Sequence, residues 1–396
     1  MQINPDDYAG HGTGYVIKIV YPKNQALLTE TLVWGKAQVL PVEREMREDC
    51  LFDIASLTKL YTSIIVHRAI DKGLLALDDN IKEIDDRFIN LENISICDLL
   101  AHRKELWTDG YLGDAISRDD FYRKLFGSRI KRPVRNYVDS HYIILSVILE
   151  KIYGKTFEKI VADEILTVLN LKNTTFHCAG QENIVSNNFE TANGEVVSSI
   201  YPGIVHDAKA RRAADLGIYA GHAGIFTTAE DFLTILKSFI DDKYLLLSKH
   251  SIKRMLIHDN VYTDIMDIMR EFAQMKNVRI NDTGNDLNKI YDDIAKNLDD
   301  EEELYLKIIR PYNYGGTRYK NPLAKKNELP LSAGDKSIIF SGYTGPIFFI
   351  DFEKCIIILV MTNTCHCSKK TRHERYSMSQ KMISDIYDYA LKLVRL

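Results

Sequence analysis

Alternating apolar and polar positions predict β-strands near both ends of the chain. Two apolar runs, residues 15–21 and 26–34, flank a turn at residues 22–24 and predict a pair of strands. Three more predicted strands alternate or run apolar near the other end, at residues 337–341, 347–351 and 355–361. Strands at both ends with helices between them indicate a single antiparallel sheet assembled from the two termini.

Helical periodicity dominates the middle of the chain. Apolar residues recur at three- and four-residue spacing after Ser56, in a segment that stops at Gly73, and the same spacing predicts helices further along. These helices are expected at residues 140–153, from residue 157 onward, at 229–240, within 251–309 and at 375–394.

These elements predict an α/β fold of the α+β kind, with an antiparallel sheet flanked by helices and a mostly helical second lobe inserted. Residues 1–73 and 215–396 would form the sheet lobe, including a helical enlargement at about 255–310. Residues 74–214 would form the helical lobe. The active site is expected in the cleft between the two lobes.

Composition excludes several classes of partner. The 396 residues carry a net charge of −4 with both signs mixed, so no basic surface for nucleic acid is expected. No apolar run of about 18 residues predicts a membrane span, and the N-terminus lacks the pattern of a secretion signal, so a cytoplasmic protein is expected. The sequence leaves the oligomeric state open.

Cysteine usage predicts neither disulfides nor a metal site. The six cysteines are scattered along the chain rather than arranged as a disulfide framework. Cys365, His366 and Cys367 lie together, but no second ligand pair follows at a usable spacing. We expect no metal and no cofactor.

The strongest candidate for chemistry is Ser56-x-x-Lys59, which follows a short apolar strand and opens an amphipathic helix. Residues three apart on a helix share a face, so the lysine amine would lie beside the serine hydroxyl, as in Ser-Lys acyl-transfer enzymes. A second Ser-x-x-Lys, Ser128 to Lys131, lies between Gly127 and Pro133 and is expected at a helix end or in a loop.

Two further segments carry candidate residues. Tyr137 and Asp139 precede the helix that begins at Ser140, where a phenol could point into a cleft and relay a proton. The alternative is a half-buried tyrosine beside an aspartate N-cap. On a C-terminal strand, small residues in the run 340–345 would let a substrate lie along the strand, with a backbone N–H facing an oxyanion. The alternative there is a plain glycine turn.

The order Ser-x-x-Lys, Tyr-x-Asp and a small-residue strand resembles the serine β-lactamase and penicillin-binding-protein-like hydrolases, in the branch of class C β-lactamases, D,D-carboxypeptidases and related esterases. The resemblance covers roughly residues 12–255 and 310–395. It covers the residues around the nucleophile motif, 51–59, and extends beyond the three motifs to residues 94–102, 205–207, 220–231 and the last strand, 360–363.

The resemblance implies a role for each matching residue. Ser56 would be the acylated nucleophile, and Lys59 and Tyr137 would share proton transfer. The amides of Ser56 and Tyr343 would form the oxyanion hole, and Ser341 and Gly342 would align the acyl donor. His206 and His222 are expected to be structural loop residues.

Two departures from the family pattern change the charge of the expected site. Phe340 stands where the family usually has a lysine or histidine that holds a substrate carboxylate, and Asp139 stands where it usually has asparagine. The site would be more negative than its relatives' by up to two charges, and an Asp139 facing Lys59 would keep Lys59 protonated, leaving more of the base role to Tyr137.

The favoured function is therefore a serine hydrolase acting on a neutral ester, amide or lactam. One alternative is a D,D-carboxypeptidase or β-lactamase whose missing cation comes from Lys336 or Arg318; another is an acyltransferase of the same fold. A third is a catalytically inactive binding or regulatory relative. In the enzymatic readings the partner is a small-molecule or peptide-like acyl substrate.

Overall fold

The structure is a computed structural model of the full chain. It describes most of the sequence, apart from a few short gaps and a long segment after residue 256. The described residues are 3–8, 10–132, 135–178, 180–192, 195–200, 202–256, 266–267, 269–270, 274, 312–320, 329–366 and 372–395.

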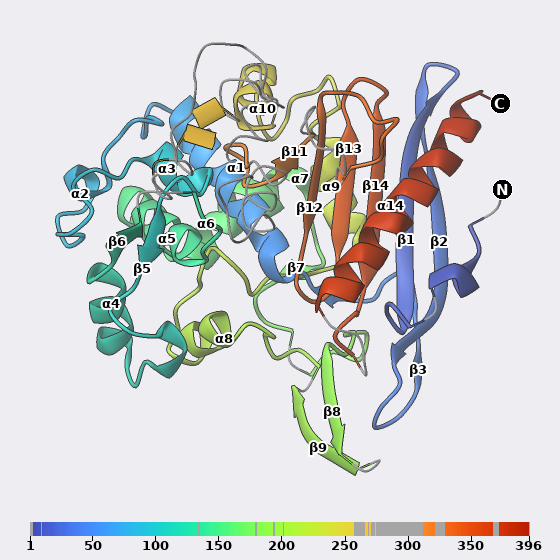
Figure 1. The fold of residues 1–396 in the computed structure, drawn as a ribbon, viewed down its shortest axis with the longest axis horizontal. Coiled ribbons are helices and arrows are strands. Elements are labelled where there is room, and N and C mark those ends of the chain that lie inside the picture. The colour runs from blue at the N-terminus through green and yellow to red at the C-terminus, as the bar shows by residue number, and fades with distance from the viewer. Residues whose placement is uncertain are drawn as a thin grey trace.

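A seven-stranded antiparallel sheet combines both ends of the chain, which confirms the predicted fold class (Figure 1). The N-terminal strand β1 pairs with the C-terminal strand β14, with Tyr15 opposite Thr362. In spatial order the strands are β11 (Arg318–Tyr319), β12 (Ser337–Ser341), β13 (Ile347–Asp351), β14 (Ile356–Thr362), β1 (Gly14–Lys23), β2 (Ala26–Gln38) and β3 (Arg44–Glu45).

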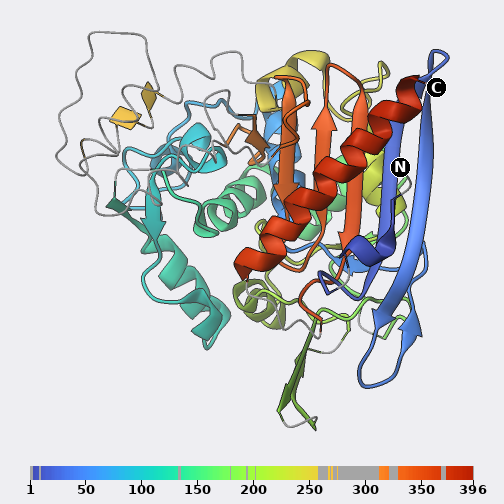
Figure 2. The ribbon, with the colours of Figure 1, turned by 45° about the vertical axis from the view of Figure 1, so that its right-hand side comes forward.

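Helices cover both faces of this sheet. Side chains alternate along a strand, so Ile17 and Ile19 of β1 face the C-terminal helix α14 (Arg372–Arg395), which crosses the sheet diagonally (Figure 2). Val16 and Val20 enter the larger core on the opposite face. That core contains the buried sides of α1 (Thr58–Asp71) and α9 (Ala229–Lys237).

The remaining helices lie mostly to the side of the sheet away from β1 and β2 (Figure 1). The longest of them is α5, which ends at Gly154 in the left-handed conformation, as the sequence predicted. The helices are α2 (Ile81–Ile84), α3 (Ile96–Leu100), α4 (Arg118–Phe126), α5 (Ser140–Tyr153), α6 (Phe157–Val161), α7 (Thr167–Leu169), α8 (Ala208–Asp215) and α10 (Lys249–Leu256). Short 3-10 helices span Pro5–Tyr8, Ala55–Leu57 and Leu112–Asp114, and a π-helical turn spans Ala162–Leu166.

Short strands outside the main sheet were mostly not predicted. The strand before Ser56, β4 (Phe52–Asp53), was expected, but the other strands of its three-stranded sheet, β10 (Phe226–Thr227) and β7 (Thr174–Thr175), were not. Neither were two small two-stranded sheets, β5 (Glu105–Trp107) with β6 (Arg129–Arg132) and β8 (Asn188–Ala192) with β9 (Glu195–Ile200).

The predicted helical enlargement at 255–310 falls almost entirely outside the described residues. The division of the chain into lobes at residues 1–73 with 215–396 and at 74–214 stays a prediction. Among the described residues, no helix is both long enough and apolar enough to cross a bilayer.

Candidate active site

Ser56 lies at a sharp entry into a buried helix. It is the middle residue of the 3-10 turn Ala55–Leu57, which follows β4 and continues into α1. Ala55 has a positive φ of 44°, and its N–H donates to the Asp53 carboxylate at 2.8 Å. Every residue from 51 to 67 is buried except Ser56, which is partly exposed. The fold therefore presents this one side chain of the segment to solvent.

Three of the predicted site residues meet at the Ser56 hydroxyl. Lys59 Nζ donates to Ser56 Oγ at 3.1 Å, and the Tyr137 hydroxyl donates to the same oxygen at 2.8 Å. Lys59 is fully buried and its ammonium lies 4.8 Å from the centre of the Tyr137 ring. Two groups able to exchange protons thus share one serine oxygen.

Asp139 faces Lys59, which is the condition under which the sequence predicted an effect of this carboxylate on the lysine. Lys59 Nζ donates to Asp139 Oδ1 at 2.9 Å and also to the backbone carbonyl of His222 at 3.2 Å. Burial would raise the pKa of Asp139, but nearby positive charge, that of Lys59 above all, holds it well below its usual range. Asp139 is therefore ionised beside the lysine.

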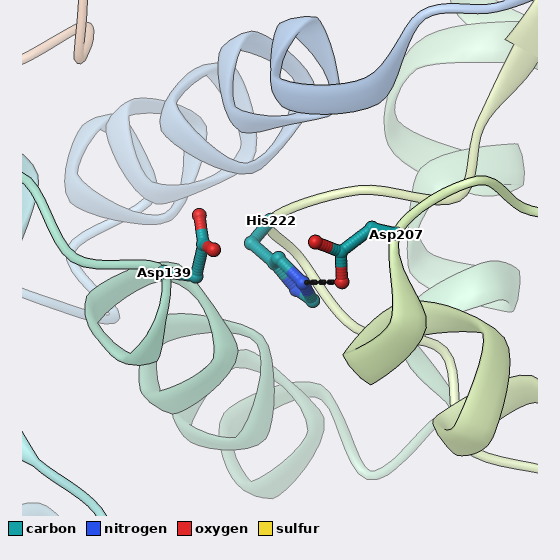
Figure 3. Close-up of side chains that lie close together, drawn as sticks. All are labelled: Asp139, Asp207 and His222. Carbon is teal, nitrogen blue, oxygen red and sulfur yellow. Dashed lines mark hydrogen bonds and ion pairs between the residues drawn. The ribbon is translucent and has the colours of Figure 1, made fainter. Parts of the chain in front are cut away.

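A second lysine, which no sequence pattern predicted, contacts the same carboxylate. Lys209, from the first turn of α8, lies 3.0 Å from Asp139 Oδ2 and 3.4 Å from Asp207 Oδ2. The other oxygen of Asp207 lies 2.9 Å from His222 Nε2 (Figure 3). Both 205–207 and 220–231 were singled out only for their resemblance to the family. No local pattern linked either segment to Asp139.

Asp139, Asp207 and His222 could bring three ligand atoms within 4.8 Å of one another, as a cation site requires (Figure 3). The Lys209 ammonium already lies between the two carboxylates. Lys209 therefore supplies the positive charge that the two carboxylates would otherwise take from a bound cation.

The end of β12 packs against the backbone that leads into Ser56. A Cβ atom on Gly342 would lie 2.5 Å from the carbonyl oxygen of Ile54, so this approach requires glycine. Two residues later, the Thr344 hydroxyl donates to the carbonyl of Asp53 at 2.7 Å. Tyr343, between these contacts, has a half-exposed side chain. The predicted oxyanion and substrate segment is thus adjacent to the nucleophile turn.

Position 340, where the family usually has a cation, is an apolar Phe340, but a cation from the neighbouring strand β11 contacts β12. Phe340 is buried in the main core. Arg318 of β11, itself buried, donates from Nη2 to Ser341 Oγ at 3.3 Å. Lys336, the other cation considered, is exposed and precedes β12 at its opposite end. Of the two, Arg318 lies beside the expected substrate strand.

Two histidines lie beneath Tyr137 and form part of its support. The His102 ring packs 4.6 Å from the Tyr137 ring, and its Nδ1 lies 2.7 Å from Nδ1 of His141. Burial lowers the pKa of both histidines, that of His141 to about 3. A neutral, packed pair therefore backs the tyrosine.

The terminal-strand sheet, its covering helices and the Ser56 turn beside β12 define a β-lactamase or transpeptidase-like fold. The chain belongs to the beta-lactamase family: the family model described as Beta-lactamase matches residues 29–378. The resemblance seen in the sequence motifs is confirmed.

Curated relatives carry several activities in their names. The chain is 24% identical over 261 residues to the N-acetylmuramyl-L-alanine amidase of Bacillus subtilis (strain 168), covering 58% of this chain and 57% of that protein. It is 25% identical over 222 residues to a putative D-alanyl-D-alanine carboxypeptidase of Escherichia coli (strain K12), covering 48% of this chain and 51% of that one. These matches span little more than half the length of either relative.

Solved structures share the fold across nearly the whole chain. EstCE1, a hydrolase with promiscuous acyltransferase activity, has a TM-score of 0.65 at 16% identity, covering 95% of this chain and 94% of that one. The D-amino acid amidase of Ochrobactrum anthropi SV3 has a TM-score of 0.62 at 16% identity, covering 99% and 97%. At these identities the likeness shows the fold alone.

Proposed function

We propose that the protein is a serine hydrolase that forms an acyl-enzyme on Ser56, with a neutral ester, amide or lactam as acyl donor. The observation that carries the proposal is the pair of hydrogen bonds from Lys59 and Tyr137 to the oxygen of one partly exposed serine. A free serine hydroxyl is too weak an acid to attack a carbonyl, and adjacent basic groups overcome this. The relatives named as amidase and carboxypeptidase support acyl transfer as the chemistry.

In the proposed reaction, Lys59 or Tyr137 first gives up a proton to solvent, because both groups donate to Ser56 Oγ in the resting site. Ser56 Oγ then attacks the acyl carbon while its own proton passes to that deprotonated group. The carbonyl oxygen becomes an oxyanion near the amides of Ser56 and Tyr343. Tyr137 then returns a proton to the leaving alcohol or amine as the acyl–heteroatom bond breaks. Water attacks the acyl-serine ester, the same groups take its proton, and the acid and free Ser56 are released.

A second candidate is a carboxylate-bearing donor, as in a D,D-carboxypeptidase or β-lactamase. It is favoured by the hydrogen bond from Arg318 to Ser341, since a guanidinium beside the substrate strand could pair with a substrate carboxylate. An acyltransferase is a further candidate, because the acyl-enzyme would be the same and only the acceptor would differ.

Intact-mass spectrometry after incubation with a fluorophosphonate and, separately, with a penicillin tests the proposal. We expect a covalent adduct with the fluorophosphonate that disappears in Ser56→Ala. The matched control is Ser128→Ala, since Ser128 begins the other Ser-x-x-Lys but is buried and bonded to the carbonyl of Leu125. Labelling by the penicillin alone would favour the second candidate. An absence of adducts with both reagents would favour an inactive binding relative.

A further inference from the structure

The charged groups behind Ser56 form a closed ring. Lys59 donates to Asp139 at 2.9 Å, and Lys209 lies 3.0 Å from the other oxygen of Asp139. Lys209 also lies 3.4 Å from Asp207, whose second oxygen contacts His222 Nε2 at 2.9 Å. The backbone carbonyl of His222 accepts the remaining bond from Lys59 at 3.2 Å. Two lysines thus share one carboxylate, each on its own oxygen.

Helix stability does not explain a lysine at position 209. Lys209 lies in the first turn of α8, where the partial positive charge of the helix terminus disfavours a cation. The turn is capped instead by Asp207, whose Oδ1 accepts from the N–H groups of Lys209 and Ala210. The lysine side chain extends between Asp207 and Asp139, two carboxylates that would otherwise repel each other across a partly buried space.

The consequence for Lys59 follows from charge. A lone Asp139 at 2.9 Å would hold the proton on Lys59 and oppose its transfer from Ser56. A second cation on the same carboxylate offsets that effect, because its field at Lys59 has the opposite sign to that of Asp139. Asp139, Asp207 and Lys209 together carry a single negative charge, whereas the two carboxylates without the lysine would carry two.

We propose that Lys209 is a positioning residue that offsets the charge of Asp139, so that Lys59 faces a carboxylate that already carries a second cation in place of a lone carboxylate. This inference rests on the proposed function of Ser56. It assigns Lys209 no contact with the substrate. It also explains how the site tolerates an aspartate where its relatives usually have asparagine.

Several other charged or titratable groups face the two lysines, and they stay constant in the comparison below. The Tyr111 ring lies 5.9 Å from Lys209, and the Tyr142 ring lies 5.8 Å from Lys59. Tyr137 and His222 contact Lys59 directly, and His102 lies behind Tyr137. None of these groups is altered by substituting Lys209 or Asp139.

The test measures the rate of fluorophosphonate labelling of Ser56 against pH, by intact mass, in three variants. Lys209→Met should slow labelling at pH 7 by about 10-fold and move the rising limb of the profile up by roughly one pH unit, because Asp139 then acts on Lys59 alone. Asp139→Asn should move the limb in the opposite direction. The double variant Asp139→Asn with Lys209→Met should lie close to the wild type.

Two controls separate this role from a merely structural one. Lys209→Arg keeps the charge and should restore the wild-type pH profile. Lys155→Met removes a surface lysine that is likewise paired with a carboxylate, Asp163, at 2.8 Å, and should leave the profile unchanged. Thermal unfolding of each variant identifies any loss of folded protein.

The inference is overturned if Lys209→Met keeps the wild-type pH profile, or if the double variant is as slow as Lys209→Met alone. Ser56→Ala distinguishes failure of the proposed function from failure of the role of Lys209. Labelling that survives Ser56→Ala overturns the proposed function and the role of Lys209 with it. Labelling lost in Ser56→Ala, with a profile that is unmoved in Lys209→Met, overturns only the role of Lys209.

Discussion

Gly342 and Ile54 approach so closely that a Cβ atom on the glycine would lie 2.5 Å from the isoleucine carbonyl oxygen. This contact joins the end of β12 to the backbone two residues before Ser56. The geometry of the expected oxyanion segment therefore depends on the absence of one side chain.

We expect Gly342→Ala to lower the free energy of unfolding by about 1–3 kcal/mol, because the end of β12 must move away from Ile54. Fluorophosphonate labelling of Ser56 should slow in the same variant, since Tyr343 moves with the strand. Gly154→Ala is the control: Gly154 has a positive φ of 63° but open space where a Cβ atom would lie. It should lose stability through backbone strain and without a steric clash, while labelling stays at the wild-type rate. Equal labelling by both variants would contradict the prediction.

Tyr137→Phe removes only the hydroxyl that donates to Ser56. The ring contacts with Lys59, at 4.8 Å, and with Tyr312, at 5.5 Å, are retained. We expect the labelling rate to fall by about 100-fold or more, the range for losing a general acid–base group, with little change in stability. Stopped-flow labelling and chemical denaturation measure the two quantities.

Tyr142→Phe is the control for that variant. The Tyr142 ring also lies near Lys59, but its hydroxyl bonds the buried Ser63 and the Leu100 carbonyl. This variant should lose about 1 kcal/mol or more of stability and keep most of its labelling rate. A Tyr137→Phe enzyme that labels as fast as Tyr142→Phe would remove Tyr137 from the proton path.

Asp53 should make stability depend on pH with an unusual sign for a carboxylate. Burial raises its pKa to about 6, although the N–H groups of His206 and Ala55 donate to it. A raised pKa in the folded state means that its stabilising contribution is complete below the unfolded value and is lost as pH rises through about 6. From pH 4 to pH 7 that loss should be on the order of 3 kcal/mol.

The measurement is the unfolding free energy of the wild type minus that of Asp53→Asn across this range. The N–H groups of Ala55 and His206 bond different oxygens of Asp53, and asparagine replaces one of these oxygens by an NH2 group that cannot accept; that cost is constant with pH. This difference in unfolding free energy should therefore decrease from pH 4 to pH 7, because the wild type loses stability over this range and the variant does not. A difference that stays flat would show that Asp53 titrates normally.

Arg318→Met separates the two candidate substrate classes. We expect the wild type to turn over a p-nitrophenyl ester faster than a peptide ending in D-Ala-D-Ala. The variant should keep kcat/KM for the ester within about 3-fold and lose at least about 10-fold for the peptide, because only the peptide carries a carboxylate for the guanidinium. Lys336→Met, at the far end of β12, should change neither value. Equal losses for both substrates would indicate that Arg318 only supports Ser341.

Elements with a long repeating pattern were predicted well from the sequence. The strands β1, β2, β12, β13 and β14 and the helices α1, α5 and α14 each contain enough apolar positions to reveal their period. Strands of two to four residues, such as β7, β10 and β6, have no measurable period. They form because other segments bring partners beside them.

The candidate site was predicted in part for the same reason. Ser56 and Lys59 share one helix turn, so local spacing identified this pair, whereas the role of Tyr137 came from the resemblance to the family. Lys209 reaches Asp139 from a segment that is remote in sequence, and no local pattern predicts that ion pair. Arg318 was named only as one of two candidate cations, and its hydrogen bond to Ser341 depends on the pairing of β11 with β12. The expected excess of negative charge was argued from the motifs alone and did not include Lys209.

The pairing of β1 with β14 has a consequence for how this protein is made. Tyr15 emerges from the ribosome long before its partner Thr362 exists, so the central sheet cannot close during most of translation. Until then the β1–β2 hairpin exposes an unsatisfied edge in the middle of the future sheet, a surface on which a nascent chain can aggregate. Final assembly of the sheet must therefore follow release of the C-terminal strands from the ribosome.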